Sequence, residues 1–242
     1  MQAIKIEALT KKYRDTVAVN SLSLTIEEGE LFSLLGVNGA GKTTTIKMLS
    51  CLTRPTGGDA KLFGHSILTD SSEVKSMIAV SPQETAVANA LTVRENLEFI
   101  CGIYAFSKEK TREKIASLSS LLSLDSVLEK KAGKLSGGYA RRLSIALALI
   151  SEPRILFLDE PTLGLDVIAR SELWDIISAL KGKVTVILTT HYMEEAEALS
   201  DRIAIMKDGE LLALGTPDEI KKSTESTSVE QAFIKIVKEG KK

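Results

Sequence analysis

The sequence predicts an α/β protein, a parallel sheet covered by helices, with a helical lobe inserted into it. Two observations lead to this prediction. Residues 155–214 alternate short apolar runs with helical segments, as consecutive βαβ units do. Residues 71–134 are rich in Ser, Leu, Lys and Glu, have mostly helical periodicity and hold no strand after residues 78–80. A chain of 242 residues is long enough for one large core, or for a core and a smaller lobe.

The N-terminal elements are predicted from apolar spacing. Apolar residues recur at every second position in 4–6 and 22–26, which indicates half-exposed strands. Residues 27–30 form a turn, and the continuous apolar run 31–35 is typical of a strand buried on both faces. A glycine-rich loop follows this strand, and residues 43–49 have helical character.

The later elements are predicted in the same way. Helical spacing predicts helices at 93–105, 108–122, 140–150, 167–179, 193–199 and 229–237. Short apolar runs predict strands at 155–158, 184–188, 203–206 and 211–214. The Ser- and Thr-rich segment 223–228 indicates a linker, and the terminal Gly-Lys-Lys is expected to be frayed.

Composition and charge exclude several classes of protein. The chain has 31 Lys and Arg against 32 Asp and Glu, and this balance argues against a protein that binds nucleic-acid backbones. No apolar run approaches the roughly 18 residues that cross a bilayer, and Lys5 and Glu7 interrupt the segment where a signal peptide would lie. Cys51 and Cys101 stand apart, so we expect neither a zinc module nor a disulfide framework, which suits a reducing cytosol.

A phosphate-binding loop is the strongest chemical signal. Residues 36–43, Gly-Val-Asn-Gly-Ala-Gly-Lys-Thr, fit GxxxxGK[ST] between a buried strand and a helix. Glycines let backbone N–H groups converge on phosphate oxygens. Lys42 would place a cation between the terminal phosphates, and the Thr43 hydroxyl would ligate Mg²⁺. A flexible glycine turn is the alternative, but the strand and helix on either side favour nucleotide binding.

Two carboxylates follow the apolar strand at 155–158. Ligands of open parallel sheets bind at the carboxyl ends of the strands, so Asp159 is expected to face the metal of a nucleotide held at Lys42. Glu160, one residue later, would point in a different direction and hold the water that attacks in line with the leaving oxygen. Two solvated acids at the end of a strand are the alternative.

A second glycine-rich loop stands at residues 135–139, Leu-Ser-Gly-Gly-Tyr. Ser136 is a good N-cap residue and the glycines open the backbone, which predicts a second anion-binding helix start. One phosphate site needs only one such loop. The simplest account is that this loop meets a nucleotide held by another copy of the protein, although a capped helix after a flexible turn would explain the segment taken alone.

The order of these motifs resembles that of the ATP-binding-cassette (ABC) ATPases over roughly residues 3–220. LSGG at 135–138 is the most specific element, and Gln83, the segment 163–166 (LGLD) and His191 complete the series. The resemblance implies a P-loop NTPase core with a parallel sheet, an N-terminal antiparallel β-subdomain and an inserted α-helical subdomain.

The same resemblance implies how the chain is organised. The chain also departs from the family pattern at two positions. Residues 1–222 would form the ABC ATPase domain, with the helical subdomain at about 84–150, and residues 223–242 a linker and short helix. Tyr139 stands where the family usually has Gln, and its larger ring affects closure or turnover in a direction that the residues do not fix. Val37 replaces a frequent Pro at a permissive position.

Individual roles also follow from the resemblance. Tyr13 would stack on adenine, and Gln83 would reach the metal and the attacking water and adjoin a transmembrane partner. Glu160 would be the catalytic base, Asp166 would couple two sites, and His191 would contact the γ-phosphate. The full set expected to contact ATP is Tyr13, Val19, Asn38, Gly39, Ala40, Gly41, Lys42, Thr43, Thr44, Ser136, Gly137, Gly138 and Asp166. The residues expected to hold Mg²⁺ are Thr43, Gln83 and Asp159.

The function implied is ATP binding and hydrolysis in a membrane ABC transporter. Segments 91–97, 191–197, 215–217 and 229–233 resemble exporter-type subunits, and we expect no extra β-domain of the kind found in many sugar importers. A head-to-tail homodimer, closed by ATP, would drive a separate integral membrane subunit from the cytoplasmic side, peripherally on the inner face of the cell membrane.

Two other functions fit the sequence less well. A non-transport ABC ATPase in translation or DNA maintenance would usually carry two cassettes or a long coiled coil, neither of which this chain has. The charge balance also predicts no nucleic-acid partner. A plain P-loop kinase or GTPase would leave LSGG unexplained, and the guanine motif NKxD does not occur.

Overall fold

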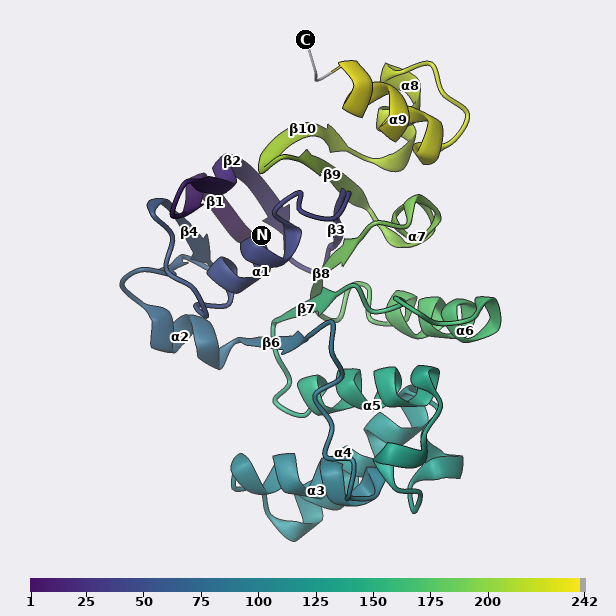
Figure 1. The fold of residues 1–242 in the computed structure, drawn as a ribbon. Helices are drawn as coiled ribbons and strands as arrows, with labels where there is room; N and C mark the ends of the chain where they lie inside the picture. The colour runs from purple at the N-terminus through teal and green to yellow at the C-terminus, as the bar shows by residue number, and fades with distance from the viewer. Residues whose placement is uncertain (240–242) are drawn as a thin grey trace.

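The computed structural model describes residues 1–239 and consists of two β-sheets flanked by helices (Figure 1). The terminal Gly-Lys-Lys, expected to be frayed, lies outside the described residues. Within residues 1–239, every helix is too short or too polar to cross a bilayer.

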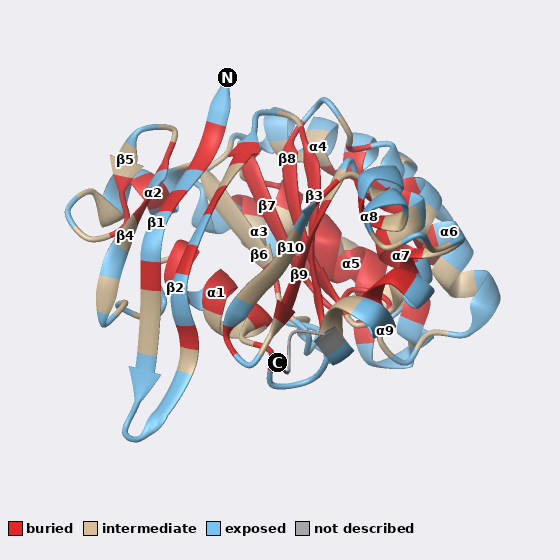
Figure 2. Ribbon diagram, turned by 90° about the horizontal axis from the view of Figure 1, so that it is seen from above, coloured by how far each residue is buried: buried red, intermediate tan, exposed pale blue. Residues whose placement is uncertain are grey.

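The central sheet has the strand order β10-β9-β3-β8-β7-β6, and all neighbours except β10 and β9 are parallel. Every residue of β3, β7 and β8 is buried, as Figure 2 shows at the centre of the molecule. One face packs against α1 and the antiparallel sheet and the other against α5 and α6. The strands are β3 (Leu31–Gly36), β6 (Ile78–Ser81), β7 (Ile155–Asp159), β8 (Thr185–Thr190), β9 (Arg202–Lys207) and β10 (Glu210–Gly215).

The last strand of this sheet adds an antiparallel member to the expected parallel sheet. β10 pairs with β9 in the antiparallel sense, with Lys207 opposite Glu210. Only Asp208 and Gly209 separate the two strands, and both have positive φ, +50° and +82°. A two-residue connection can join only antiparallel neighbours, because a parallel pair needs a long crossover.

The second sheet is the antiparallel β-subdomain expected from the family resemblance. Its order is β2-β1-β4-β5, and its strands are β1 (Gln2–Tyr13), β2 (Thr16–Glu27), β4 (Gly57–Leu62) and β5 (His65–Ser66). β4 and β5 carry little apolar periodicity and were not predicted. Gly58 in β4 has φ +70°, and a Cβ there would lie 2.2 Å from the Ala8 carbonyl oxygen of β1, so glycine permits this pairing.

Within residues 1–239, six helices begin at a polar residue whose side chain accepts a backbone N–H bond, the usual N-cap arrangement. These caps are Thr92, Ser107, Ser136, Asp166, Thr216 and Ser228. The helices are α1 (Lys42–Leu49), α2 (Ser71–Ser76), α3 (Val93–Ile103), α4 (Lys108–Leu121), α5 (Gly137–Leu149), α6 (Val167–Ser178), α7 (Met193–Leu199), α8 (Pro217–Ser223) and α9 (Val229–Glu239).

The inserted helical lobe is formed by α3, α4 and α5, which pack on one another between β6 and β7 in the chain (Figure 1). The short helix α2, which the composition placed in the same helical region, packs instead against β5 and β6. Its buried Val74 belongs to the core beneath the antiparallel sheet. The segment expected to be a linker overlaps the end of α8, a helix that was not predicted, and α8 packs against α9 and β10.

The topology brings the phosphate loop, the two adjacent acids and His191 to one edge of the central sheet. In the strand register, Leu35 of β3 pairs with Thr190 of β8, and Asp159 of β7 pairs with Thr189. The loops that follow β3, β7 and β8 therefore leave the sheet at the same carboxyl edge, where open parallel sheets bind ligands.

Candidate nucleotide-binding site

A cavity of about 500 Å³ opens at this edge of the sheet. It collects residues from the loops after β3, β6, β7 and β8 and from the β1–β2 hairpin. Its lining residues are Tyr13, Ala18, Asn38, Gly39, Ala40, Gly41, Lys42, Thr43, Thr44, Gln83, Glu160, Leu163 and His191. Its volume lies within the range of about 300–1,000 Å³ usual for small-molecule sites.

The loop after β3 has the conformation that a phosphate cradle requires. Gly41, the residue before α1, has φ +99°, and a Cβ there would lie 2.4 Å from the Ala18 carbonyl oxygen. Glycine is therefore needed at this position. Without a side chain, Gly41 cannot cap α1, so the first amides of the helix stay available to an anion at its positive end.

Lys42 lies at the base of the cavity and is almost fully buried. Its ammonium donates to the carbonyl oxygens of Gly36 at 2.7 Å and Val37 at 3.2 Å, and lies 3.5 Å from Glu160 Oε1. Burial lowers the pKa of Lys42, and the carboxylates of Glu160 and Asp159 act against that shift. The lysine is thus a buried cation held between backbone oxygens and an acid, and terminal phosphates could replace these partners.

The two adjacent acids diverge, as predicted. Asp159 accepts hydrogen bonds from the hydroxyls of Thr43, at 3.1 Å, and of Thr189. Glu160 turns instead toward Lys42 and His191, whose Nδ1 lies 3.3 Å from Oε2. Glu160 also has φ +47°, the left-handed region that non-glycine residues rarely occupy, and its N–H donates to both oxygens of Thr189. Such backbone strain is concentrated at functional sites.

The oxygen atoms of Thr43 and Asp159 are suitable ligands for Mg²⁺. Magnesium prefers hydroxyl and carboxylate oxygens and completes its shell with waters and nucleotide phosphates. Within residues 1–239, three or more His, Cys, Asp or Glu side chains nowhere cluster as an all-protein metal site. Two protein oxygens would leave the remaining ligand positions of the metal to waters and nucleotide phosphates. Gln83, the third expected ligand, lies in the cavity wall with an exposed side chain.

The adenine side of the cavity differs in one detail from the expectation. Tyr13 is 45% exposed, with the Lys11 ammonium 4.9 Å from its ring centroid, and lines the cavity. Val19 is fully buried behind Gly41, so Val19 lies outside the lining and its neighbour Ala18 occupies that place. Ala18 and Leu163 also line the cavity and were not expected there, because small and aliphatic lining residues carry no chemical signature.

The second glycine loop does not contribute to this cavity. Ser136 caps α5, accepting from the Tyr139 N–H at 3.5 Å, and Asp166 caps α6, accepting from the Ala169 N–H at 2.9 Å. Gly138 approaches Ala169 so closely that an added Cβ would lie 3.1 Å from the alanine methyl. Ser136, Gly137, Gly138 and Asp166 thus lie at the starts of α5 and α6, outside the lining of the cavity, and Gly138 is buried there. Tyr139 turns its ring toward the core of the lobe.

Glu195 is a functional candidate that the sequence did not reveal. It lies in α7, just after His191, and is fully buried. Its Oε1 accepts a hydrogen bond from the indole N–H of Trp174 in α6 at 3.1 Å. Burial raises its pKa, and the neighbouring polar groups of Thr190, Thr162 and Trp174 act in the opposite direction. The acid therefore ties the loop of His191 to the helix that begins at Asp166.

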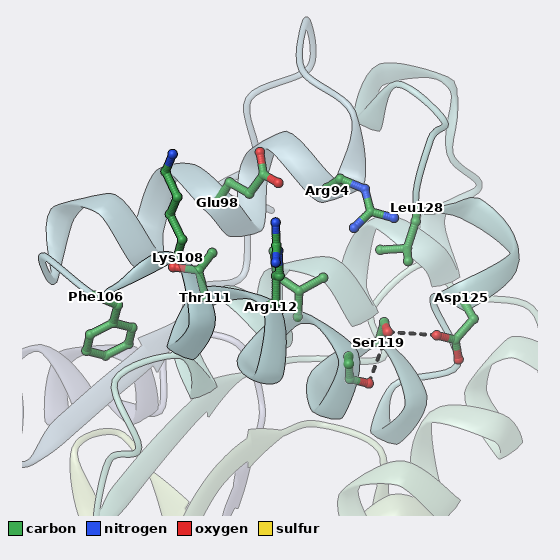
Figure 3. A pocket seen from close by; sticks show the side chains of 11 residues that line it. Arg94, Glu98, Phe106, Lys108, Thr111, Arg112, Ser119, Asp125 and Leu128 are labelled. Atoms are coloured by element: carbon green, nitrogen blue, oxygen red, sulfur yellow. Dashed lines mark hydrogen bonds between the residues drawn. The ribbon is translucent and has the colours of Figure 1, made fainter.

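A second cavity, of about 600 Å³, lies in the helical lobe between α3 and α4 (Figure 3). Charged and polar side chains of both helices line much of it. Ser119 donates to Asp125 at 2.7 Å, and Arg94 donates to Glu129 at 2.7 Å. None of the predicted site residues lines this cavity.

Comparisons with known proteins agree with this geometry. The family model "ABC transporter" matches residues 19–163. The chain is 42% identical to the daunorubicin/doxorubicin resistance ATP-binding protein DrrA of Streptomyces peucetius, over 92% of this chain and 68% of that protein. It is 39% identical to the probable multidrug ABC transporter ATP-binding protein YbhF of Escherichia coli (strain K12), over 97% of this chain but 41% of that protein. Among solved structures, the dimeric bacterial ABC transporter cassette MJ0796 matches with a TM-score of 0.79 and 29% identity, over 88% of this chain and 98% of the cassette.

Proposed function

Because the chain belongs to the ABC transporter family and is an ATP-binding subunit with ATPase activity, we propose that two copies close head to tail around two ATP molecules and drive an exporter. The observation that carries this proposal is the separation of the two anion-binding helix starts. Lys42 lines the cavity, whereas Ser136, Gly137 and Gly138 lie on a different surface of the same chain. In the proposed dimer, each cavity is completed by the second loop of the other copy.

The site residues divide the catalytic work. Lys42 and the first amides of α1 bind the terminal phosphates. Thr43 and Asp159 would hold Mg²⁺, which would neutralise phosphate charge. Glu160 accepts the proton of the attacking water, and His191 beside it contacts the γ-phosphate and keeps the carboxylate in place. Gln83 extends from the loop after β6 toward the same reacting centre.

The membrane subunit is proposed to dock in a groove of the helical lobe. A cavity of about 350 Å³ lies between β6, α3 and α5, and Pro82, next to Gln83, is part of its wall. At the end of α3, Ile103 and the following Tyr104 line this cavity and are 64% and 50% exposed, and Phe99, one turn earlier, is 60% exposed. Such a run of large apolar side chains marks an interaction surface. This docking would hold the chain on the cytoplasmic face of the cell membrane, and the transported compound would be selected by the partner.

Ile103→Glu tests the docking surface. A charge in the groove is expected to move most of the protein from the membrane fraction to the supernatant when cells are lysed and fractionated, since a buried unpaired carboxylate is costly. ATPase activity of the purified protein should remain. Leu52→Glu is the matched control, because Leu52 is 68% exposed but lies after α1, away from the groove. Equal membrane fractions for both variants would contradict this docking site.

Mixing two inactive variants tests the shared sites. Lys42→Ala removes the phosphate cation, and Ser136→Glu places a negative charge at the second helix start; each homodimer should be nearly inactive. In a mixed dimer, the Lys42 of one chain meets the Ser136 of the other, so one complete site re-forms. Equal mixing should restore up to roughly a quarter of the wild-type rate, since half of the dimers are mixed and each has one intact site. Full activity of Ser136→Glu alone, or no recovery on mixing, would contradict the arrangement.

A further inference from the structure

Arg141 joins two functional segments that lie far apart in the sequence. It is on the second turn of α5, soon after the Ser136 loop, and its side chain is 5% exposed. One terminal nitrogen, Nη1, donates to the Pro82 carbonyl oxygen at 2.7 Å, and the other, Nη2, donates to the Gln83 carbonyl oxygen at 2.6 Å. The planar guanidinium therefore binds the carbonyl oxygens of two consecutive residues.

These two carbonyl groups belong to the stretch of backbone that positions Gln83. Their loop leaves β6 and runs along the surface, with Gln83 and Glu84 exposed. Farther along, Asn96 of α3 holds the loop through both polar groups of Ala88, at 2.8 and 3.1 Å. Arg141 thus holds the end of the loop nearest to the nucleotide cavity.

The two hydrogen bonds of Arg141 are strong and fix the orientation of the loop. A hydrogen bond from a charged donor is roughly twice as strong as a neutral one, and a two-pronged guanidinium fixes orientation as well as distance. One turn farther along α5, the hydroxyl oxygens of Ser144 and Ser81 lie 3.0 Å apart, on the same side of the helix. The start of the Gln83 loop is therefore fastened to α5 at two successive points.

We propose that Arg141 is a positioning residue that couples the two ATP sites of the dimer. Gln83 lines the cavity of its own chain, whereas α5 of the same chain presents Ser136 to the nucleotide of the partner. A movement of the Gln83 loop on ATP binding is passed by Arg141 to α5, and so to the other site. The inference rests on the proposed head-to-tail dimer.

The test is the cooperativity of Arg141→Met, which keeps the length of the side chain but removes both donors. The Hill coefficient of ATP hydrolysis, which cannot exceed two for two sites, is expected to fall from above one to about one. The dissociation constant of the ATP-driven dimer should rise roughly fivefold or more, the lower end of typical site-to-site coupling. Affinity of the monomer for ATP, titrated at protein concentrations too low for dimerisation, should change less than about twofold, because Arg141 does not line the cavity.

Arg142→Met is the matched control. Arg142 is the next residue of α5 and is 6% exposed, but its guanidinium pairs with Glu172 of α6 and not with the loop. The Arg142→Met protein loses the same charge and should keep the wild-type cooperativity of ATP hydrolysis. Arg141→Lys retains a buried cation with one donor group and should show an intermediate Hill coefficient. If Arg141→Met does not fold, Arg141→Lys tests the coupling role in its place.

The outcomes separate this inference from the function on which it rests. A wild-type protein that neither dimerises with ATP nor responds cooperatively contradicts both. A cooperative wild type with an equally cooperative, folded Arg141→Met or Arg141→Lys overturns only the coupling role. Equal loss of cooperativity in Arg142→Met would also overturn it, since the effect would then follow from losing any buried arginine of α5.

Discussion

Glu160→Gln is expected to bind ATP, to lose hydrolysis by about 10²–10⁴-fold and to accumulate as a dimer with two trapped nucleotides. The amide has nearly the same shape as the carboxylate but cannot take the proton of the attacking water. It also removes a negative charge that lies 3.5 Å from the Lys42 ammonium, so that cation is freer to bind phosphate. Binding without turnover keeps the closed state populated.

Gel filtration in Mg-ATP and a steady-state phosphate-release assay measure the two effects separately. Glu225→Gln, an exposed residue of the segment between α8 and α9, is the control and should behave as the wild type in both. A Glu160→Gln protein that stayed monomeric in ATP and released phosphate at the wild-type rate would remove Glu160 from the reaction. If the Glu160→Gln protein dimerised but still hydrolysed ATP, a group other than Glu160 would accept the proton of the attacking water.

The parts of the site that were predictable are those that local sequence determines. Residues 36–43 must form a phosphate loop wherever a buried strand precedes them and a helix follows, because the glycines and the helix start are contiguous. The divergence of Asp159 and Glu160 also follows from their being neighbours at a strand end. Helix caps are local signals too. Thr216 and Glu219 form a capping box with Pro217 at the first helical position, so the sequence itself carries a signal for α8, which was not among the predicted helices.

The parts that were not predictable depend on contacts between distant segments. β4 reads Gly-Gly-Asp-Ala-Lys-Leu, a poor strand by composition, and is extended because it pairs with β1. Arg141 and Glu195 look like ordinary charges on helices. The first is buried by the loop after β6 and the second by α6, so their partners lie 58 and 21 residues away in the chain.

Tyr139 shows how a departure from a family pattern is interpreted once the side chain is placed. The sequence left open how a ring would act beside the LSGG loop. The ring packs against the core of the lobe, with the Arg142 guanidinium 5.2 Å from its centroid, so Tyr139 stabilises α5 through packing and leaves the Ser136 end of the helix clear. The Tyr139 amide donates to the Ser136 hydroxyl, as at other helix N-caps.

Lys42→Ala is expected to weaken ATP binding by roughly 10- to 100-fold or more, the equivalent of losing one charge-assisted contact of about 1.5–3 kcal/mol together with its charge. The wild-type ammonium needs no new position to bind phosphate, because it already lies at the cavity base on two backbone oxygens. Without it, Glu160 faces the phosphates with no cation between, and like charges oppose each other in a buried setting.

Calorimetric titration with ATP measures the loss. Lys47→Ala removes the same charge from an exposed position of the same helix, so it controls for the general effect of a cation on an anionic ligand. Screening makes the exposed charge worth little, whereas the buried one acts at contact distance, so only Lys42→Ala should change the affinity strongly. Unchanged affinity in a folded Lys42→Ala protein would mean that the amides of α1 alone hold the phosphates, and the nucleotide site would then have to be assigned without its lysine.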